Sequence, residues 1–440
     1  MAVACGGGGG GGGGGVSGVG FGGGVAVGGG GASIRGELLE PAAIIETFSA
    51  ARIDALTSAS KIQSITGKAR CEVRMLRLNY RTIGVKGEWT NATGALLMPL
   101  GPACDGAATL LAYSKGTDVV QQRTFANAND VETQFLISMY AAQGYAVVAS
   151  DMLGFAGSGY GFHPYLHADS EASATIDALR AARHAMRAAG GALNGKVMAT
   201  GYSQGGHTSM ATQRAIERDL AAEFNFVAGA HLAGPYNLSA TVRGDLAIAG
   251  SQVTLPYMIT SYQKTYGDLY REPSDVFKSP YAGYVQDLLP SKTHTLATLI
   301  TSGLLPAGTP EAVKSALLRD EFRADYRSNP QNGLYRAAGH NDLLDWTPRA
   351  PMLLCGGAGD PTVPLAVHQA PAEAAFKARG AVNVTSVDVD PQIQAAFGVN
   401  GKTPDSADPT FAAYMGAYHS QYEGTFCHAL ARRHLDGLNR

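Results

Sequence analysis

The chain has 440 residues, and 19 of its 57 glycines lie in the first 31 positions, which carry no charged residue. An unbroken glycine run at 6–15 offers no side chains to pack, so residues 1–35 are predicted to be a disordered tether. The chain as a whole has 45% hydrophobic residues, so the part after the tail can form a large globular core. A formal net charge of −2 gives no field that would attract nucleic acid or an anionic surface, which disfavours both as partners.

The residues before the glycine run resemble the end of a bacterial lipoprotein signal, in which small residues precede a cysteine, here Cys5. Such a cysteine is lipid-modified, and a glycine tether after it would hold the protein near a membrane. The charged and apolar parts of a signal do not precede it, so two interpretations stay open: a signal further upstream, or an incidental cysteine in a linker. No apolar stretch reaches 18 residues, so no transmembrane helix is expected.

Residues 36–68 carry apolar positions near a 3.6-residue period, which predicts a helix. Residues 73–82 alternate apolar and polar side chains, and 94–98 return after a turn, which predicts two paired strands. Short apolar runs then alternate with helical segments, as in a parallel sheet covered on both faces. The predicted strands are 109–113, 145–150, 197–200, 226–232, 352–355 and 384–389, and the helices lie near 131–142, 169–189, 204–220 and 365–379.

The segment 236–345 interrupts this alternation with more than a hundred residues rich in tyrosine. An insertion of this length between two strands predicts a helical cap over the carboxyl edge of the sheet, although a helical decoration without substrate contact is an alternative. The expected organisation is a core in two parts, 36–235 and 346–440, with the cap between them.

Four cysteines remain when Cys5 is set aside, namely Cys71, Cys104, Cys355 and Cys427. An even number fits two disulfides in an exported protein, although four buried thiols are an alternative. The sequence does not fix their pairing. The first two flank the predicted strand pair, so a bridge between them would close that unit and leave the last two for each other.

One G-x-S-x-G motif occurs in the chain, with Ser203 at its centre. The motif alone is weak, because a glycine-rich chain produces it by chance, but here a predicted strand runs into it and a predicted helix follows. In a strand–turn–helix of this kind, the turn holds the serine in a strained conformation and exposes its hydroxyl at the edge of the sheet. We therefore expect Ser203 to be a nucleophile, which needs a base and an acid.

The acid and the base are expected in later loops. Asp360 follows the strand 352–355 and is the preferred acid, ahead of four competitors. These are Asp342, Asp345, Asp388 and Asp390. His419 is the preferred base because it follows the last strand in a predicted loop, whereas His428 and His434 fall on the predicted helix behind it.

An oxyanion hole is expected from two backbone N–H groups. Gln204 begins the helix after the nucleophile, and Thr117 lies in the loop after the strand 109–113, where Gly116 allows a close approach. Lys115 is either solvated or paired with an acid, and Asp118 is either a partner or the cap of a turn.

With these residues in place, the chain resembles the secretory lipase family of α/β-hydrolases, which includes fungal lipase A-type enzymes and secreted bacterial esterases. The likeness extends over nearly all of residues 70–433. Its segments are 80–82, 113–117, 151–154, 163–168, 201–205, 234–237, 345–348, the loop of Asp360 and the region of His419. Bacterial members commonly have histidine where this chain has Lys115. His163 and His167 match a family pattern and are expected to be structural.

The resemblance implies an α/β-hydrolase fold, with a mostly parallel central sheet, helices on both faces and an inserted cap. It also implies hydrolysis of carboxylic esters, including lipids, by a serine esterase or lipase that needs no metal and no cofactor. The alternatives are a peptidase, a cell-wall esterase of the feruloyl type, or a surface lipoprotein that only binds. An exported protein is expected, either secreted or lipid-anchored in the bacterial envelope.

Overall fold

The computed structural model describes residues 34–439. Cys5 and residues 1–33 of the predicted tether lie outside the described residues. Within 34–439, no helix is both long and apolar enough to cross a membrane.

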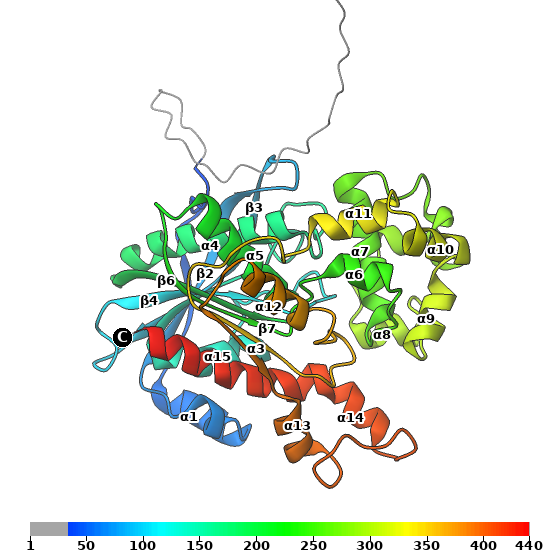
Figure 1. Ribbon diagram of the computed structural model, residues 1–440. Coiled ribbons are helices and arrows are strands. Elements are labelled where there is room, and N and C mark those ends of the chain that lie inside the picture. The colour runs from blue at the N-terminus through cyan, green and yellow to red at the C-terminus, as the bar shows by residue number, and fades with distance from the viewer. Residues whose placement is uncertain (1–33, 440) are drawn as a thin grey trace, which may run out of the picture.

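A nine-stranded sheet forms the centre of the described part of the chain (Figure 1). Its strands are β1 (Ala43–Phe48), β2 (Glu72–Ile83), β3 (Trp89–Leu100), β4 (Ala108–Ser114), β5 (Tyr145–Ser150), β6 (Leu193–Tyr202), β7 (Asn225–Leu232), β8 (Met352–Gly356) and β9 (Val384–Asp388). Their order is β1-β2-β3-β5-β4-β6-β7-β8-β9. The pairings that join β1, β2, β3 and β5 are antiparallel, and those from β5 to β9 are parallel. The mostly parallel sheet predicted from the alternation of apolar runs is therefore present.

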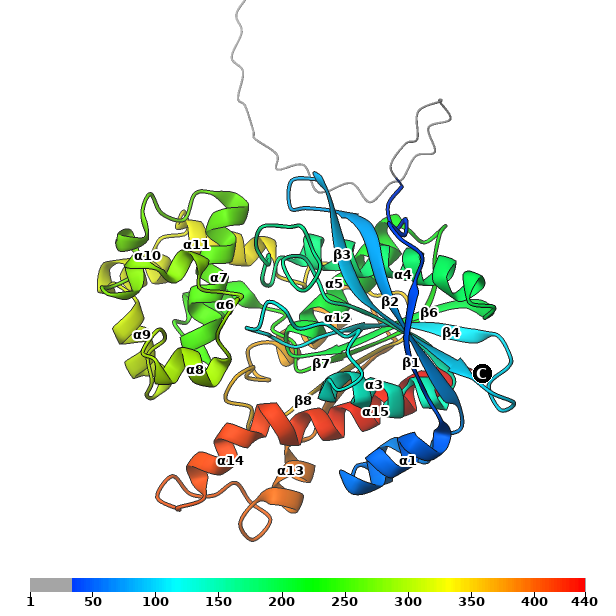
Figure 2. The same ribbon diagram turned by 180° about the vertical axis from the view of Figure 1, so that it is seen from behind.

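Helices cover both faces of this sheet (Figures 1 and 2). One face packs against α4 (Ala168–Ala188), α5 (Gln204–Asp219) and α12 (Gln369–Ala378). The other packs against α1 (Ala50–Ala59), α3 (Val131–Met139), α13 (Asp390–Phe397) and α15 (Gly424–Leu438). Every residue of β4 and β5 is buried, as expected for central strands that have a helical layer on each side.

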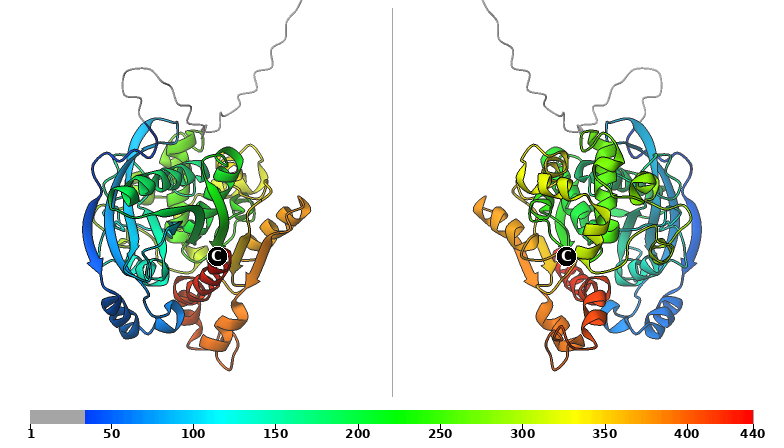
Figure 3. Two further views of the ribbon diagram at one scale, coloured as in Figure 1. Left: turned by 90° about the vertical axis from the view of Figure 1, so that its left-hand side faces the viewer. Right: turned by 90° about the vertical axis from the view of Figure 1, so that its right-hand side faces the viewer.

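The predicted helix over 36–68 is wrong in its first half. Residues Ala43–Phe48 form the edge strand β1, which pairs with β2, and helix starts only at Ala50. The adjacent residues Ile44 and Ile45 are β-branched and largely exposed, which suits an edge strand better than a helix. Ser49 then begins α1 by accepting a hydrogen bond from the N–H of Arg52, and the short helix α2 (Gln63–Thr66) follows. Figure 3 shows β1 at one edge of the sheet and the segment around α12 and α13 at the other.

Six α-helices lie between β7 and β8 and gather to one side of the sheet (Figure 1). They are α6 (Leu238–Arg243), α7 (Ser251–Tyr266), α8 (Leu296–Thr301), α9 (Pro310–Leu317), α10 (Asp320–Ser328) and α11 (Gly333–His340). They enclose an apolar cluster of their own, whose fully buried side chains include Tyr262, Val276 and Leu317. We refer to the segment from α6 to α11 as the cap.

Two disulfides join the four cysteines. Cys71 bonds to Cys104, and Cys355 bonds to Cys427, so the alternative of four free thiols is wrong. The first bridge joins the start of β2 to the loop after β3. The second joins β8 to α15, which lie 72 residues apart in sequence.

Candidate active site

Ser203 lies between the end of β6 and the first residue of α5. Its φ of 59° is in the left-handed region, which is strained for a residue other than glycine. The turn is tight enough to require glycine on both sides. A Cβ on Gly201 would overlap the carbonyl oxygen of Gly205, and a Cβ on Gly205 would overlap that of Ser114. The sequence therefore holds the serine hydroxyl at the carboxyl edge of the sheet.

A continuous chain of hydrogen bonds connects Ser203, His419 and Asp360. The hydroxyl of Ser203 lies 2.8 Å from Nε2 of His419, and Nδ1 of His419 lies 2.7 Å from Oδ2 of Asp360. The side chain of Asp360 is fully buried, whereas 13% of the His419 side chain is exposed. The arrangement can move a proton from a serine hydroxyl to an imidazole and stabilise the charge that forms.

Asp360 lies on the loop after β8, as the sequence predicts, and its Oδ1 accepts the N–H of Thr362 at 2.8 Å. His419 does not lie in a loop. It is in a π-helical turn, Tyr418–Glu423, that connects α14 (Phe411–Ala417) to α15. The helical period continues through this segment with one wider turn, and such turns are frequent at functional sites. The loop expected around His419 is therefore wrong.

Proximity shifts the pKa of both partners. Burial alone would lower the pKa of His419, but the charge and hydrogen bond of Asp360 raise it to about 10. Burial alone would raise the pKa of Asp360, but the charge of His419 holds it below its ordinary value. Each partner thus favours the charged form of the other.

The side chain of Gln204 is held away from the serine by a buried network. Its amide donates to Nε2 of His163 at 2.8 Å and to Oε1 of Glu171 at 2.6 Å. Oε2 of Glu171 also accepts from Thr208, at 2.7 Å, and lies 3.3 Å from Nδ1 of His207. As the first residue of α5, Gln204 has a backbone N–H without a partner inside the helix. The network therefore fixes the residue that carries one predicted oxyanion donor.

His163 and His167 have structural contacts. Nδ1 of His163 donates to the carbonyl of Leu153, and burial lowers the pKa of His163 to about 4. His167 caps α4 by accepting the N–H of Ser170. Neither histidine contacts Ser203, in agreement with the sequence-based expectation.

The loop after β4 lies close to Ser203. A Cβ on Gly116 would lie 3.8 Å from that of Ser203, and the hydroxyl of Thr117 lies 2.8 Å from that of Tyr165. Lys115 is buried, with Nζ 3.6 Å from Asp118 and 3.4 Å from the ring centre of Phe155. The lysine is thus paired with an acid rather than solvated.

The competing candidates lie elsewhere. Asp342 accepts from Ser239 at the start of α6, Asp388 accepts the N–H of Ala358, and Asp390 accepts the hydroxyl of Tyr418. Asp345 is largely exposed on its side chain. On α15, Nδ1 of His428 lies 3.0 Å from the hydroxyl of Tyr140, and burial lowers the pKa of His428 to about 3. His434 is on the same helix, and burial lowers the pKa of His434 too.

Sequence reasoning missed Glu423, a buried carboxylate beside His419. Its Oε2 lies 3.3 Å from Nδ1 of His419 and 3.0 Å from the hydroxyl of Tyr202. The four-residue spacing from His419 to Glu423 on a helical segment was the available signal. The side chains of Asp360, His419 and Glu423 form a group whose ligand-type atoms lie within 4.8 Å of one another. Both nitrogens of His419 already face hydrogen-bonding partners, so the group is better suited to proton transfer than to holding a metal.

A cavity of about 810 Å³ opens above Ser203 and His419, between the core and the cap. Its apolar side chains include Leu238, Val242, Leu246 and Met258. Asp245 and Lys314 line it too, and their charges pair with each other at 2.5 Å. We call it the cap cavity.

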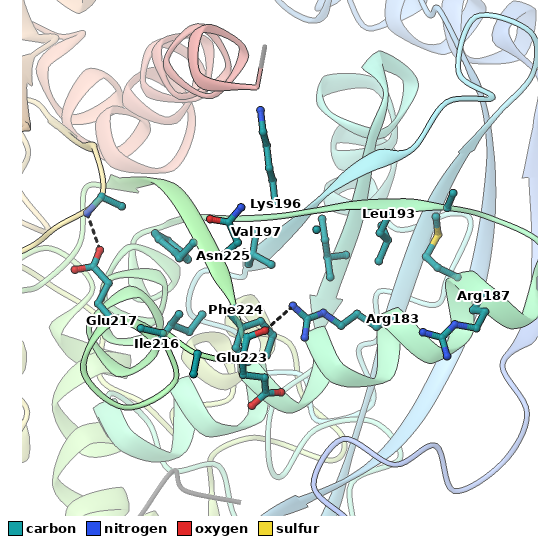
Figure 4. A pocket seen from close by; sticks show the side chains of 18 of the residues that line it. Arg183, Arg187, Leu193, Lys196, Val197, Ile216, Glu217, Glu223, Phe224 and Asn225 are labelled. Atoms are coloured by element: carbon teal, nitrogen blue, oxygen red, sulfur yellow. Dashed lines mark hydrogen bonds between the residues drawn. The ribbon is translucent and has the colours of Figure 1, made fainter.

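A second hollow, shown in Figure 4, has a volume of about 940 Å³. It lies at the end of β6 and β7 that is opposite to the serine. It is lined by the beginnings of β6 and β7, whereas Ser203 follows the end of β6. Several of its charged groups are already hydrogen-bonded. Glu217 accepts the N–H groups of Arg349 and Ala350, and Arg183 donates to the carbonyl of Glu223. It contains no part of the serine, histidine and aspartate chain.

Comparison with known proteins places the chain in a family. A family model described as secretory lipase matches residues 121–273. The rice cell wall degrading esterase LipA from Xanthomonas oryzae is 36% identical, with a TM-score of 0.79 over 92% of this chain and 99% of that chain. Lipase A of Candida antarctica shares the fold at 16% identity, with a TM-score of 0.58 over 80% of this chain and 76% of that chain. A search of curated proteins gave no match.

The fold is therefore that of the α/β-hydrolases, as predicted, and the class of enzyme is that of the carboxylic ester hydrolases, esterases and lipases. The chain belongs to the secretory lipase family. That family and the two disulfides also indicate an exported protein.

Proposed function

We propose that the protein hydrolyses carboxylic esters through an acyl-enzyme formed on Ser203, with His419 as the base and Asp360 as the acid. The hydrogen-bonded chain from Ser203 to Asp360, at 2.8 and 2.7 Å, is the observation that carries this proposal. The apolar lining of the cap cavity directly above it supports an ester with an apolar acyl chain.

In the first half of the reaction, the oxygen of Ser203 attacks the ester carbonyl while Nε2 of His419 takes the hydroxyl proton. The tetrahedral intermediate collapses, the bond to the alcohol oxygen breaks, and His419 gives its proton to that oxygen. Water then repeats these steps on the acyl-enzyme and releases the carboxylic acid. Asp360 remains ionised throughout and stabilises the imidazolium.

The negative oxygen of the intermediate is proposed to accept from the backbone N–H groups of Gln204 and Thr117. The position of Gln204 at the start of α5 supports this, because the helix N-terminus favours negative charge. The close approach of Gly116 to Ser203 supports a donor from the same loop.

Replacement of Ser203 by alanine tests the mechanism. We expect hydrolysis of short-chain aryl esters to fall by at least about 10³-fold, because the residual rate then depends on binding and the oxyanion donors alone. A fluorophosphonate probe should label the wild-type protein and leave S203A unlabelled. An S203A variant that keeps full activity would exclude the mechanism, and a wild-type protein that resists both ester and probe would favour a binding function.

The natural substrate is proposed to be an ester rather than an amide. The name of the Xanthomonas oryzae neighbour also makes a cell-wall ester a candidate substrate for this chain. Parallel assays on aliphatic, feruloyl and peptide substrates separate these candidates, and peptide hydrolysis faster than ester hydrolysis would overturn the assignment.

For location, we propose that Cys5 carries a lipid and that residues 1–35 tether an enzyme made of the core segments 36–235 and 346–440 and the inserted segment 236–345. The observation behind this proposal is the small residues and glycine run that flank Cys5. Metabolic labelling with a fatty acid should mark the wild-type protein and leave Cys5→Ser unmarked; membrane partitioning retained in the Cys5→Ser variant would exclude the lipid anchor.

A further inference from the structure

Glu423 is a buried carboxylate that the proposed mechanism does not use. Its side chain is fully buried, and Oε2 lies 3.3 Å from Nδ1 of His419, on the same side of the ring as Asp360 at 2.7 Å. Its other oxygen, Oε1, has no hydrogen-bond partner among the described residues. A carboxylate buried in this way is costly unless the site gains from it.

The turn that carries the serine holds this carboxylate in place. Tyr202 immediately precedes Ser203, and its hydroxyl lies 3.0 Å from Oε2 of Glu423. The same ring packs against His419, with the ring centres 5.0 Å apart. Glu423 therefore cannot turn away from the imidazole without breaking its contact with the nucleophile turn.

We propose that Glu423 is a second acid for His419. It lies beside Asp360 and can pair with the imidazolium when the charge of Asp360 is lost. This inference rests on the proposed function. Glu423 acts through His419, so it is a positioning residue.

The electrostatics of the cluster support this role. Burial, and then the charge of Asp360, raise the pKa of Glu423 to about 8, so its acid form predominates at neutral pH. The ionisable groups that interact with it are those of Asp360 and His419 and the phenols of Tyr202, Tyr236 and Tyr418. Removal of Asp360 removes the negative charge that opposes ionisation. Among residues 34–439, Glu423 then becomes the only carboxylate in contact with Nδ1 of His419.

The test compares D360A, E423Q and the double variant D360A/E423Q. Loss of a triad acid costs about 10⁴-fold in kcat where no second acid is present. Here we expect D360A to lose only roughly 10–100-fold and E423Q to lose less than about tenfold. The double variant is expected to fall at least about 100-fold below D360A, with KM little changed in all three.

A purely structural role of Glu423 would give a different pattern. The kcat of D360A should fall with decreasing pH as Glu423 becomes protonated, whereas the double variant should show only the titration of His419 itself. D360N repeats the comparison if D360A does not fold, and thermal melting checks folding. A folded D360A or D360N as inactive as its double variant would overturn the proposal. Failure of the serine mechanism would be separate, because it would appear as full activity in S203A.

A groove on the other side of the serine carries a second, independent inference. It has a volume of about 1,170 Å³ and runs between α1, α3 and the start of α15. Four residues at its inner end, Gly116, Thr117, Tyr202 and Ser420, also line the cap cavity. The two hollows therefore share a wall beside Ser203, whose chain neighbour Tyr202 lines both. We call the hollow between α1, α3 and α15 the α1–α3 groove.

The lining of the α1–α3 groove suits a neutral apolar group. Its lining includes Tyr113, Phe135 and His428, and the ring of His428 packs against the rings of the other two. The charged residues of its rim already form ion pairs, because Arg123 contacts both Asp130 and Glu132. The rim therefore offers little free charge to an ionic ligand.

We infer that the α1–α3 groove binds the alcohol part of the ester, and that this alcohol is bulky and apolar or aromatic. This again rests on the proposed function. His419 must pass its proton to the leaving oxygen, and Ser420, Gln421 and Gly424, which lie within five residues after His419 in the chain, line this groove. The acyl chain then occupies the cap cavity, which contains Gln204 and the apolar cap residues.

Substitutions in the two hollows separate the two ends of the substrate. Thr425 lines the α1–α3 groove and not the cap cavity, and Val242 the reverse. We expect Thr425→Trp to lower kcat/KM for 1-naphthyl butyrate at least about tenfold relative to methyl butyrate, because the indole fills the groove. Thr425→Val is the matched control and should keep the wild-type ratio. Val242→Trp should change the preference between methyl acetate and methyl octanoate and leave the alcohol preference unchanged.

An unchanged naphthyl-to-methyl ratio in a folded T425W would overturn this assignment, and so would a change in acyl preference alone. Loss of hydrolysis of both butyrates would be followed at Gln134, which also lines the groove. Gln134→Trp must then reproduce the selective loss of the naphthyl ester, or the assignment fails. These outcomes test only the assignment of the groove. Failure of the proposed function would appear differently, as full activity in S203A.

Discussion

The conformation of Ser203 depends on its neighbours having no side chain. A residue with φ near 59° costs of order 1–3 kcal/mol, so the surrounding turn must hold it firmly. Gly201 and Gly205 make this possible because each lies against a backbone carbonyl that a Cβ would overlap. The motif is thus a requirement for close packing as well as a chemical signature.

Replacement of Gly205 by alanine should therefore damage both stability and activity. The added Cβ would meet the carbonyl of Ser114, and the turn must shift to admit it. We expect a loss of about 1–3 kcal/mol in the free energy of unfolding and a marked fall in kcat. Gly437→Ala, on the exposed side of α15 with open space around its Cβ position, is the control and should be near neutral. Equal behaviour of the two variants in denaturant unfolding would contradict the close-packing argument.

The pKa of His419 sets a second expectation at this scale. The carboxylate of Asp360 raises it to about 10 against the effect of burial, so the imidazole becomes free to accept the serine proton only as the pH rises. We expect kcat/KM to increase above pH 6.5 and on into the alkaline range. The raised pKa also means that the His419 contribution to stability is complete below about pH 6.5 and is lost as the pH rises through about 10.

Two measurements check this. A pH–rate profile on a soluble ester should have its acid-side midpoint above 6.5, and a plateau reached below that pH would contradict the shift. The melting temperature of the wild type relative to His419→Gln should be highest at acid to neutral pH, above the titration of Asp360, and the difference should shrink toward pH 10.

At the scale of elements, one disulfide joins the parts of the chain that carry the proposed acid and the proposed base. Cys355 is in β8, five residues before Asp360, and Cys427 is on α15, eight residues after His419. The other disulfide, between Cys71 and Cys104, lies at the ends of β2 and β3. It joins neither β8 nor α15. The two bridges therefore have different relations to the site.

We expect both bridges to stabilise the fold and only one to affect hydrolysis directly. Loss of either should reduce the free energy of unfolding by about 2–4 kcal/mol, because loops of 33 and 72 residues are closed. C355A/C427A should also lower kcat at temperatures where it is fully folded, since β8 and α15 are no longer held together. C71A/C104A is the matched control, and an equal loss of kcat in both would contradict this distinction.

The elements also show what sequence patterns can reveal. The apolar runs of β4 to β8 are readable because both faces of these strands are buried, so each appears as a continuous hydrophobic run. The edge strand β1 was missed because its pairing with β2 decides its conformation, and local periodicity does not record a distant partner. Among the site residues, Ser203 and Asp360 follow readable strands, whereas the π-helical turn of His419 leaves no such pattern. Glu423 has meaning only once that turn places it beside the imidazole.

At the scale of the whole molecule, the cap and the core divide the work of the site. The core supplies Ser203, His419 and Asp360 from three separate parts of the chain, and the cap supplies most of the apolar wall above them. A fixed chemical centre under a wall that varies independently lets one fold accept different acyl groups. Acyl preference is therefore a property of the assembled molecule, and the order of residues along the chain does not reveal it.

If the acyl group binds in the cap cavity as proposed, its lining predicts a definite chain-length profile. Each buried CH₂ contributes about 0.8 kcal/mol, so kcat/KM should rise by up to about fourfold per added CH₂ while the chain lies against Val242, Leu246 and Met258. The rise should stop where the chain meets the ion pair of Asp245 and Lys314, because an apolar chain gains nothing from displacing paired charges. Methyl esters from acetate to dodecanoate, assayed below their solubility limits and as emulsions above them, measure this profile. Val242→Trp should make it level off at a shorter chain, and a profile that declines from acetate onward would show that the cap cavity does not hold the acyl group.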